Sequence, residues 1–202
     1  MFAVMLVLLR YFLPSQKSLF FLLYNLFLAM IPLVVSTYIR FYLQGNIYKI
    51  KLLMFCLLWL VFFPNAPYLL TDGLHVMGND FTMILFDIVI WIYITGIAIW
   101  IAMLSLMDIE LMLFQTTMNK LLIHCSIILI VVLSGYGIYL GRDLRLNSWD
   151  VLRKPFLLLD YIRQTFTNQT PGFFNWKAVF FYSSILYIGY IVFKLMNRKS
   201  TN

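Results

Sequence analysis

Residues 50–70 (IKLLMFCLLWLVFFPNAPYLL) form an apolar stretch that is long enough to cross a bilayer, which needs about 20 helical residues. Its second half contains Pro64 and Pro67, with Asn65 between them. Each proline removes a backbone donor and clashes with the preceding turn, so we expect a broken helix. In hydrocarbon the freed carbonyl groups need partners, and irregular backbone is tolerated only against protein or a wet cavity. Because the polar residues 71–75 follow directly, this segment is the first candidate for function.

Composition places the chain in the membrane class. Hydrophobic residues make up 63% of the chain and charged residues 11%, whereas ordinary soluble domains are about a quarter charged. We expect a single all-α integral membrane domain over residues 1–202, folded as a polytopic transmembrane bundle in the lipid bilayer. The net charge of +7 does not indicate a nucleic-acid partner, because the basic residues lie in loops and at span ends.

The apolar stretches predict five to six spans. The five full spans are residues 18–41, 50–70, 82–107, 120–141 and 176–196. Residues 1–13 are short for a span, and we expect them to form a short first helix with Arg10 near the surface. In the long loop after the fourth full span, residues 151–166 gather apolar side chains on one helical side, which predicts an amphipathic helix lying in the interface.

Alternation of the spans assigns the loops to two sides of the membrane. We call one side face A, and its loops are residues 14–17, 71–81 and 142–175. The other side is face B, and it holds residues 42–49, residues 108–119 and the C-terminal tail. Lys and Arg in the short loops and the tail favour face B as cytoplasmic. With residues 1–13 as a sixth span, both termini would be cytoplasmic, and face A would look outward.

Polar residues at face A come from two distant parts of the sequence. We expect a charged rim made of Asp72, His75, Asp80, Arg142 and Arg145. Beneath it, at about 8–10 Å from the surface by the rise of ~1.5 Å per residue, we expect a polar layer. That layer consists of Asn25, Asn65, Asp87 and Tyr139. An intramembrane carboxylate such as Asp87 is costly and usually faces the bundle interior.

The chemistry of these side chains suggests roles. The candidate catalytic residues are Asp72, His75 and Asp87, since carboxylates and imidazole act as general bases. The candidate substrate-binding residues are Asn65, Tyr68, Arg142, Arg145, Asn147 and Asp150. Paired guanidinium groups suit phosphate or carboxylate. Two simpler readings stay open: the arginines contact lipid phosphates without specificity, and the polar layer only ties helices together.

A metal site is a less favoured reading of the same residues. A divalent metal held by Asp72, His75 and Asp87 would combine one imidazole with carboxylates. The only other histidine, His124, begins a span at face B, most of a ~30 Å membrane away from His75. A lone histidine near a membrane surface is more often an interfacial polar residue.

The same two blocks carry a family resemblance. Residues 64–68 (PNAPY) are followed by Thr71, Asp72 and His75, and residues 137–142 (GIYLGR) are followed by Arg145 and residues 147–150 (NSWD). With Asp87 between them, these blocks resemble a bacterial integral-membrane family known only as a numbered domain of unknown function. The resemblance covers most of residues 20–155 and implies a multi-pass protein of the bacterial plasma membrane. It supplies no activity.

Three functions remain in competition. The favoured one is an enzyme or binding protein that acts on an anionic lipid-linked or peptide substrate at the membrane surface, which includes anionic lipid headgroups as partners. The second is an assembly factor or partner subunit for another membrane protein, with the polar residues holding the bundle. The third is a transporter component, which broken helices and buried carboxylates also fit. The sequence shows no polar path through the middle of the bilayer, which disfavours transport.

Overall fold

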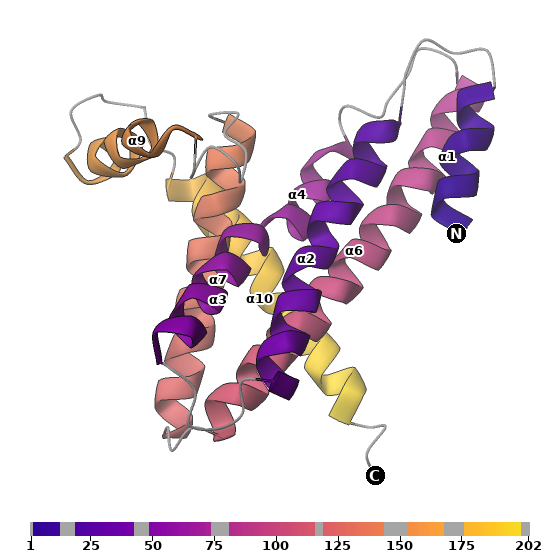
Figure 1. The fold of residues 1–202 in the computed structure, drawn as a ribbon. Coiled ribbons are helices and arrows are strands. Elements are labelled where there is room, and N and C mark those ends of the chain that lie inside the picture. Colours follow the sequence, from indigo (N-terminus) through magenta and orange to yellow (C-terminus); the bar gives the residue numbers. More distant parts are fainter. Residues whose placement is uncertain are drawn as a thin grey trace.

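The computed structural model describes residues 2–12, 19–42, 49–73, 81–115, 119–143, 153–167 and 176–198. Within these ranges the chain is helical and contains no strand (Figure 1). The helices are α1 (Phe2–Phe12), α2 (Phe20–Tyr42), α3 (Lys49–Phe62), α4 (Asn65–Thr71), α6 (Phe81–Gln115), α7 (Lys120–Asp143), α9 (Pro155–Thr167) and α10 (Trp176–Arg198). The predicted all-α class is confirmed.

Five stretches in the described part of the chain are long and apolar enough to cross a membrane. They are Phe20–Tyr42, Ile50–Thr71, Ile84–Gln115, Lys120–Arg142 and Trp176–Asn197. Large apolar side chains are exposed along all of them, as expected of a surface that faces lipid. The chain is therefore a multi-pass integral membrane protein built as a transmembrane helical bundle.

Helix α1 is too short to be a further full span. Its 11 residues extend about 16 Å at ~1.5 Å per residue, about half of a ~30 Å hydrocarbon core. The helix packs against α6. Helix α1 as described is therefore not among the five stretches that are long enough to cross a membrane, and the shared side of both termini stays a prediction.

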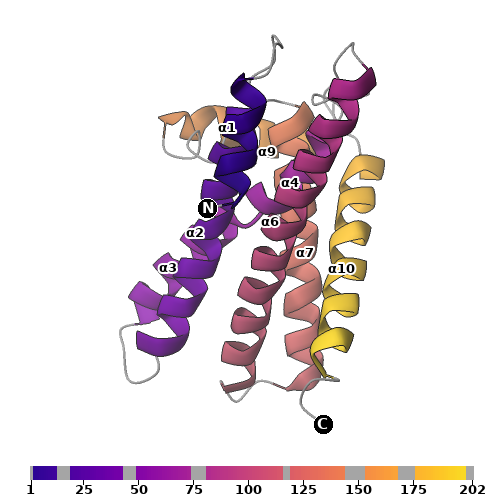
Figure 2. The ribbon, with the colours of Figure 1, turned by 90° about the vertical axis from the view of Figure 1, so that its right-hand side faces the viewer.

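Two pairs of long helices and one short helix form the core. Helix α2 packs along α6, and α10 packs along α7. Helix α4 lies among α2, α6 and α7, so the second half of the broken span is the piece that joins the two pairs (Figures 1 and 2). Its residues Ala66, Pro67 and Leu69 are buried, and Ala66 and Leu69 belong to the hydrophobic core.

The predicted break in the second full span is confirmed, and its cause is local. Helix α3 ends at Phe62 and α4 begins at Asn65, directly after the first proline of the PNAPY block. The Asn65 side chain donates a hydrogen bond through Nδ2 to the carbonyl oxygen of Phe62 at 2.9 Å. Beyond the break, the amide of Tyr68 donates to the carbonyl oxygen of Pro64 at 3.0 Å. A side chain thus serves a carbonyl group beside the break, as hydrocarbon requires.

Helix α6 is longer than the sequence suggested. The expected span ended at residue 107, followed by a loop at face B, but α6 continues to Gln115 and has 35 residues. Asp108 and Glu110 are therefore helical residues rather than loop residues. The physical reason is that both carboxylates have cationic partners on neighbouring helices, so their charges do not force the helix to end.

Candidate functional site

The candidate site at face A is centred on a buried hydrogen bond between α2 and the end of α4. Asn25 donates through Nδ2 to Oδ2 of Asp72, and the two atoms are 3.1 Å apart. Asp72 follows the last residue of α4, and its exposed fraction is 5%. The sequence predicts Asp72 in a charged rim above Asn25. Instead the two residues lie together in the bundle, because the short helix α4 is packed inward between α2 and α6.

A second acidic side chain is buried on α6. Asp87 is fully buried and lies one helical turn before Trp91. The indole Nε1 of Trp91 donates to the carbonyl oxygen of Leu69 in α4 at 2.8 Å. A Cβ atom at Gly73 would lie 2.5 Å from the Trp91 ring, so the end of α4 rests directly on this indole. Trp91 therefore holds the end of α4 against α6, one turn after Asp87. Asp72 directly follows this end of α4.

The second sequence block reaches the broken helix from α7. Tyr68 Oη donates to the carbonyl oxygen of Gly141 at 3.5 Å. A Cβ atom at Gly137 would lie 2.8 Å from Pro64 Cγ, so the absence of a side chain on α7 lets the break approach closely. Tyr139, which lies between the two glycines in the sequence, is buried. Arg142, in the last turn of α7, is exposed. The two blocks thus meet at one end of the bundle.

The predicted site residues fall into two groups. Those that the structure describes are Asn25, Asn65, Tyr68, Asp72, Asp87, Tyr139 and Arg142. Those outside the described residues are His75, Asp80, Arg145, Asn147 and Asp150. Within the first group, Asn65 and Tyr68 donate hydrogen bonds to backbone carbonyl groups, and Asn25 donates directly to Asp72. Positions of the second group relative to these side chains remain expectations from the sequence.

The described side chains of the candidate site include two carboxyl groups and one guanidinium group. Across the described ranges, no three His, Cys, Asp or Glu side chains form a group that could bind a metal ion. His75, the imidazole of the suggested metal site, lies outside those ranges. Asp72 and Asp87 remain acceptors that can take a proton, and Arg142 offers an exposed guanidinium at the same end of the bundle.

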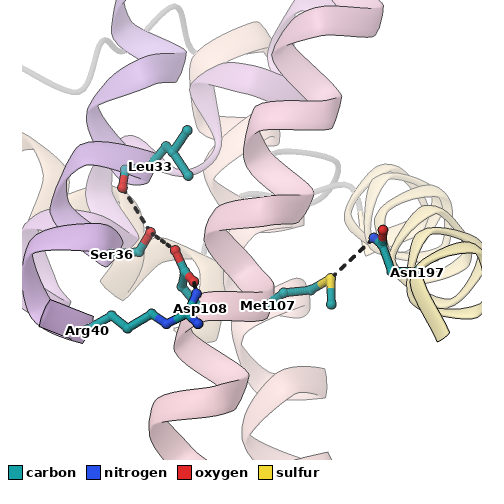
Figure 3. Close-up of polar contacts among 6 residues, drawn as sticks. All are labelled: Leu33, Ser36, Arg40, Met107, Asp108 and Asn197. Carbon is teal, nitrogen blue, oxygen red and sulfur yellow. Dashed lines mark hydrogen bonds and ion pairs between the residues drawn. The ribbon is translucent and has the colours of Figure 1, made fainter. Parts of the chain in front are cut away.

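A polar cluster at face B was missed by sequence reasoning. Arg40 Nη1 on α2 lies 2.7 Å from Asp108 Oδ1 on α6, and Ser36 Oγ donates to Oδ2 of the same carboxylate at 3.3 Å (Figure 3). On another side of α6, Lys194 of α10 pairs with Glu110. The sequence could have indicated this ion pair, because Arg40 and Asp108 lie near the face B ends of two apolar stretches. The pair was missed because Asp108 was expected to lie in a loop.

The face B contacts fix three helices to one another. Asp108 binds α2, Glu110 binds α10, and Asn197 Nδ2 of α10 lies 3.7 Å from Met107 Sδ, as Figure 3 shows in part. Deeper in the bundle, Trp59 Nε1 of α3 donates to Ser105 Oγ of α6 at 2.7 Å, and both side chains are buried. Helix α6 therefore makes polar contacts with neighbouring helices both at face B and, through Trp91, toward face A.

Comparison with known proteins gives the family. A family model described as "Protein of unknown function (DUF1361)" matches residues 24–188. The chain belongs to the DUF1361 family. No curated protein and no solved structure matches it.

The DUF1361 match contains the whole candidate site at face A. It begins one residue before Asn25 and extends past Asp72, Asp87 and Arg142. At face B it contains Arg40, but Lys194 lies beyond its end. The family resemblance drawn from the two sequence blocks is therefore confirmed, and the contact between the blocks lies within the DUF1361 region.

Proposed function

We propose that this DUF1361 protein is a plasma-membrane enzyme or binding protein that acts on an anionic lipid-linked or peptide substrate. The site is at face A, which we assign to the outer surface because the basic residues of face B lie at span ends and in the C-terminal tail, whereas most of those of face A lie in one long loop beside three aspartates. The observation that carries the proposal is the buried contact between Asn25 Nδ2 and Asp72 Oδ2 at 3.1 Å, close to a second buried acid, Asp87.

Buried acids at this depth need an explanation beyond packing. A carboxyl group within a membrane bundle is costly, and such groups commonly mark functional sites. Asp72 follows the end of α4, and α4 packs against α6, the helix that carries Asp87, so both buried acids belong to the same part of the bundle. A carboxyl group in such surroundings can accept or donate a proton during a reaction.

The cationic part of the site comes from the end of α7. Arg142 is exposed there, and α7 contacts α4 through Gly137 and Gly141. A guanidinium group at this position suits the phosphate or carboxylate of an anionic substrate. In the proposal, Arg145, Asn147 and Asp150 complete this binding region, and His75 joins Asp72 as a proton acceptor. Asn65 and Tyr68 hold the broken helix in place through their backbone partners.

Lipid composition tests the catalytic part. Wild-type protein and the Asp72→Asn and Asp87→Asn variants are expressed in a host, and membrane extracts are compared by untargeted mass spectrometry. Asparagine keeps the shape of each side chain and removes its charge. Wild type should change the abundance of at least one anionic lipid-linked or peptide species, and both variants should lose that change at equal expression and thermal stability. If both variants match wild type, the proposal fails. Asp160→Asn on exposed α9 is the matched control.

A paired substitution tests the cationic part. Arg142 and Lys177 are both exposed cations at the face A end of the bundle, but only Arg142 adjoins the candidate site. Arg142→Gln should weaken binding of a polyprenyl phosphate about tenfold in native mass spectrometry, the loss expected for a charged hydrogen bond. Lys177→Gln should leave binding unchanged. Equal effects of the two substitutions would show that face A attracts anions only through its general charge.

An assembly role is the second candidate, favoured by one observation. A shallow apolar groove on the outer side of α6 is lined by Ile92, Tyr93, Gly96, Ile97, Trp100 and Ile101. No atom lies within 4 Å of a Cβ atom built at Gly96, so another helix could approach there. Gly96→Leu should then release a copurifying membrane protein, while both aspartate variants keep it. Retention by Gly96→Leu would count against this role.

A further inference from the structure

Helix α9 lies at the level where two spanning helices end. Figures 1 and 2, which are turned by 90° from each other, both show its axis running across the bundle at the end where α7 stops and α10 begins. Trp176, the first residue of α10, is exposed there, and tryptophan favours the membrane–water interface. Because α7 ends and α10 begins at face A, we place α9 near the membrane surface rather than within the hydrocarbon core.

The exposed side of α9 combines apolar and basic groups. Phe156 is 80% exposed, Leu159 58% and Leu157 39%, whereas Leu158 and Ile162 are half-buried. Three exposed bases and one exposed acid accompany these exposed apolar residues, and they are Arg153, Lys154, Arg163 and Asp160. The spacing of three to four residues between Phe156, Leu159 and Arg163 places them on one side of the helix.

We propose that α9 docks on anionic lipid headgroups of the face A leaflet. Phe156 and Leu159 enter the boundary between headgroups and acyl chains, and Arg153, Lys154 and Arg163 contact lipid phosphates. Two observations select lipid over a protein partner. The helix lies in the plane expected of an interfacial helix, and its exposed charge is net basic, complementary to an anionic surface. This surface uses none of the buried acids of the candidate site, so it stands independently of the proposed function.

Fluorescence quenching tests the depth of the helix in the full-length protein. In a background with Cys56→Ala and Cys125→Ala, either Leu159→Cys or Gln164→Cys is labelled with an environment-sensitive dye. The protein is reconstituted in phosphatidylcholine vesicles containing phosphatidylglycerol. Positions five residues apart differ by about 140° around the helix axis, so these two labels report on different sides. The label at 159 should be quenched by nitroxide on lipid acyl chains, and the label at 164 should be quenched less by the nitroxide than the label at 159.

Lipid charge supplies the second arm. Replacing Arg153, Lys154 and Arg163 with Gln removes three bases, each worth about fivefold in attraction to an anionic surface. In the parent protein, the equilibrium constant for insertion of α9, reported by the label at 159, should increase with the phosphatidylglycerol content. In the triple variant this increase should be smaller by up to about a hundredfold. Lys120→Gln with Lys177→Gln, at exposed bases on α7 and α10, should retain the dependence on phosphatidylglycerol.

Each arm has an outcome that overturns the proposal. Quenching of the label at 159 by iodide and not by nitroxide lipid would place α9 in water. Insertion that is equal with and without phosphatidylglycerol would remove the preference for anionic headgroups. Intact folding of the triple variant is checked by its thermal denaturation, and if the triple variant unfolds, the salt dependence of insertion in the parent protein decides. Insertion that does not weaken with added salt would then reject the role of the basic side chains.

Discussion

Gly137 of α7 lies so close to Pro64 that a Cβ atom on it would stand 2.8 Å from the proline Cγ. This approach joins the two polar blocks, since Tyr68 reaches the carbonyl of Gly141 one turn further along α7. The proline that breaks the second span is thus also the surface on which α7 packs. Irregular backbone here is covered by protein, as the hydrocarbon environment demands.

Substitution of this glycine should destabilise the bundle. In Gly137→Ala the new methyl group meets a proline ring that cannot rotate away, so α4 and α7 must separate. Overpacking of this kind costs about 1–3 kcal/mol. Thermal denaturation in detergent measures the loss. Gly96→Ala is the matched control, because a Cβ atom there meets nothing within 4 Å. A loss in Gly96→Ala as large as that in Gly137→Ala would show that steric contact is not the cause.

Gly135 should be still less tolerant of a side chain. A Cβ atom at this position would lie 2.2 Å from Ser183 Oγ and 2.9 Å from the backbone oxygen of Val179 in α10. A backbone atom cannot move without shifting the helix, so Gly135→Ala should separate α7 from α10. We expect a loss at the upper end of the ~1–3 kcal/mol range for overpacking. The double variant Gly135→Ala/Ser183→Gly should regain only part of the lost unfolding free energy, since the new methyl group still meets the backbone oxygen of Val179.

Removing Arg40 should weaken the face B end of α2. The side chain of Asp108 is 12% exposed. Without Arg40 it would lose its cationic partner and keep the hydrogen bond from Ser36. Arg40 itself is 41% exposed, so water screens the pair. We therefore expect a loss of about 1–2 kcal/mol in Arg40→Met.

A double variant separates charge from packing at the same pair. Arg40→Met/Asp108→Leu removes both charges, and such replacements are often neutral or stabilising. Its unfolding free energy should return toward that of wild type. If the double variant is as unstable as the sum of its single substitutions, the ion pair is not the source of the effect.

The buried hydrogen bond between Trp59 and Ser105 can be measured by a double-mutant cycle. Trp59→Phe removes the indole donor, and Ser105→Ala removes the acceptor that lies 2.7 Å away. Interhelical hydrogen bonds in membrane proteins contribute about 0.6 kcal/mol on average and up to about 1.7 kcal/mol. Because both side chains are buried, we expect a coupling energy toward the upper value. A coupling energy of zero would mean that the contact does not stabilise the fold.

Asn65 should matter for stability as well as for any activity. Its Nδ2 donates to the carbonyl oxygen of Phe62 at 2.9 Å, beside the break in the helix. Asn65→Ala should therefore cost about 1 kcal/mol, measured by chemical or thermal unfolding in detergent. Ser184→Ala is the control, because Ser184 Oγ donates to the carbonyl of Phe180 within the unbroken helix α10. A smaller loss in Asn65→Ala than in Ser184→Ala would contradict this account.

Much of the fold could be predicted because it follows from local physics. Apolar length alone predicts the five spans, and two prolines three residues apart predict the break between α3 and α4. The amphipathic pattern in the long loop predicted a helix at residues 151–166, and α9 covers Pro155–Thr167. The expected depth of Asn25 placed it near face A, where its amide meets Asp72.

What the sequence determined by itself was the class of the protein, its spans and the position of its broken helix. Only the tertiary structure decided that Asp72 is buried against Asn25, and that α6 continues through Asp108 and Glu110. Both outcomes depend on partners that are distant along the chain: α4 packs inward against α2 and α6, and Arg40 and Lys194 meet the two acids. A charged residue ends a span when it must face water, but it can extend a helix when a neighbouring helix provides the opposite charge.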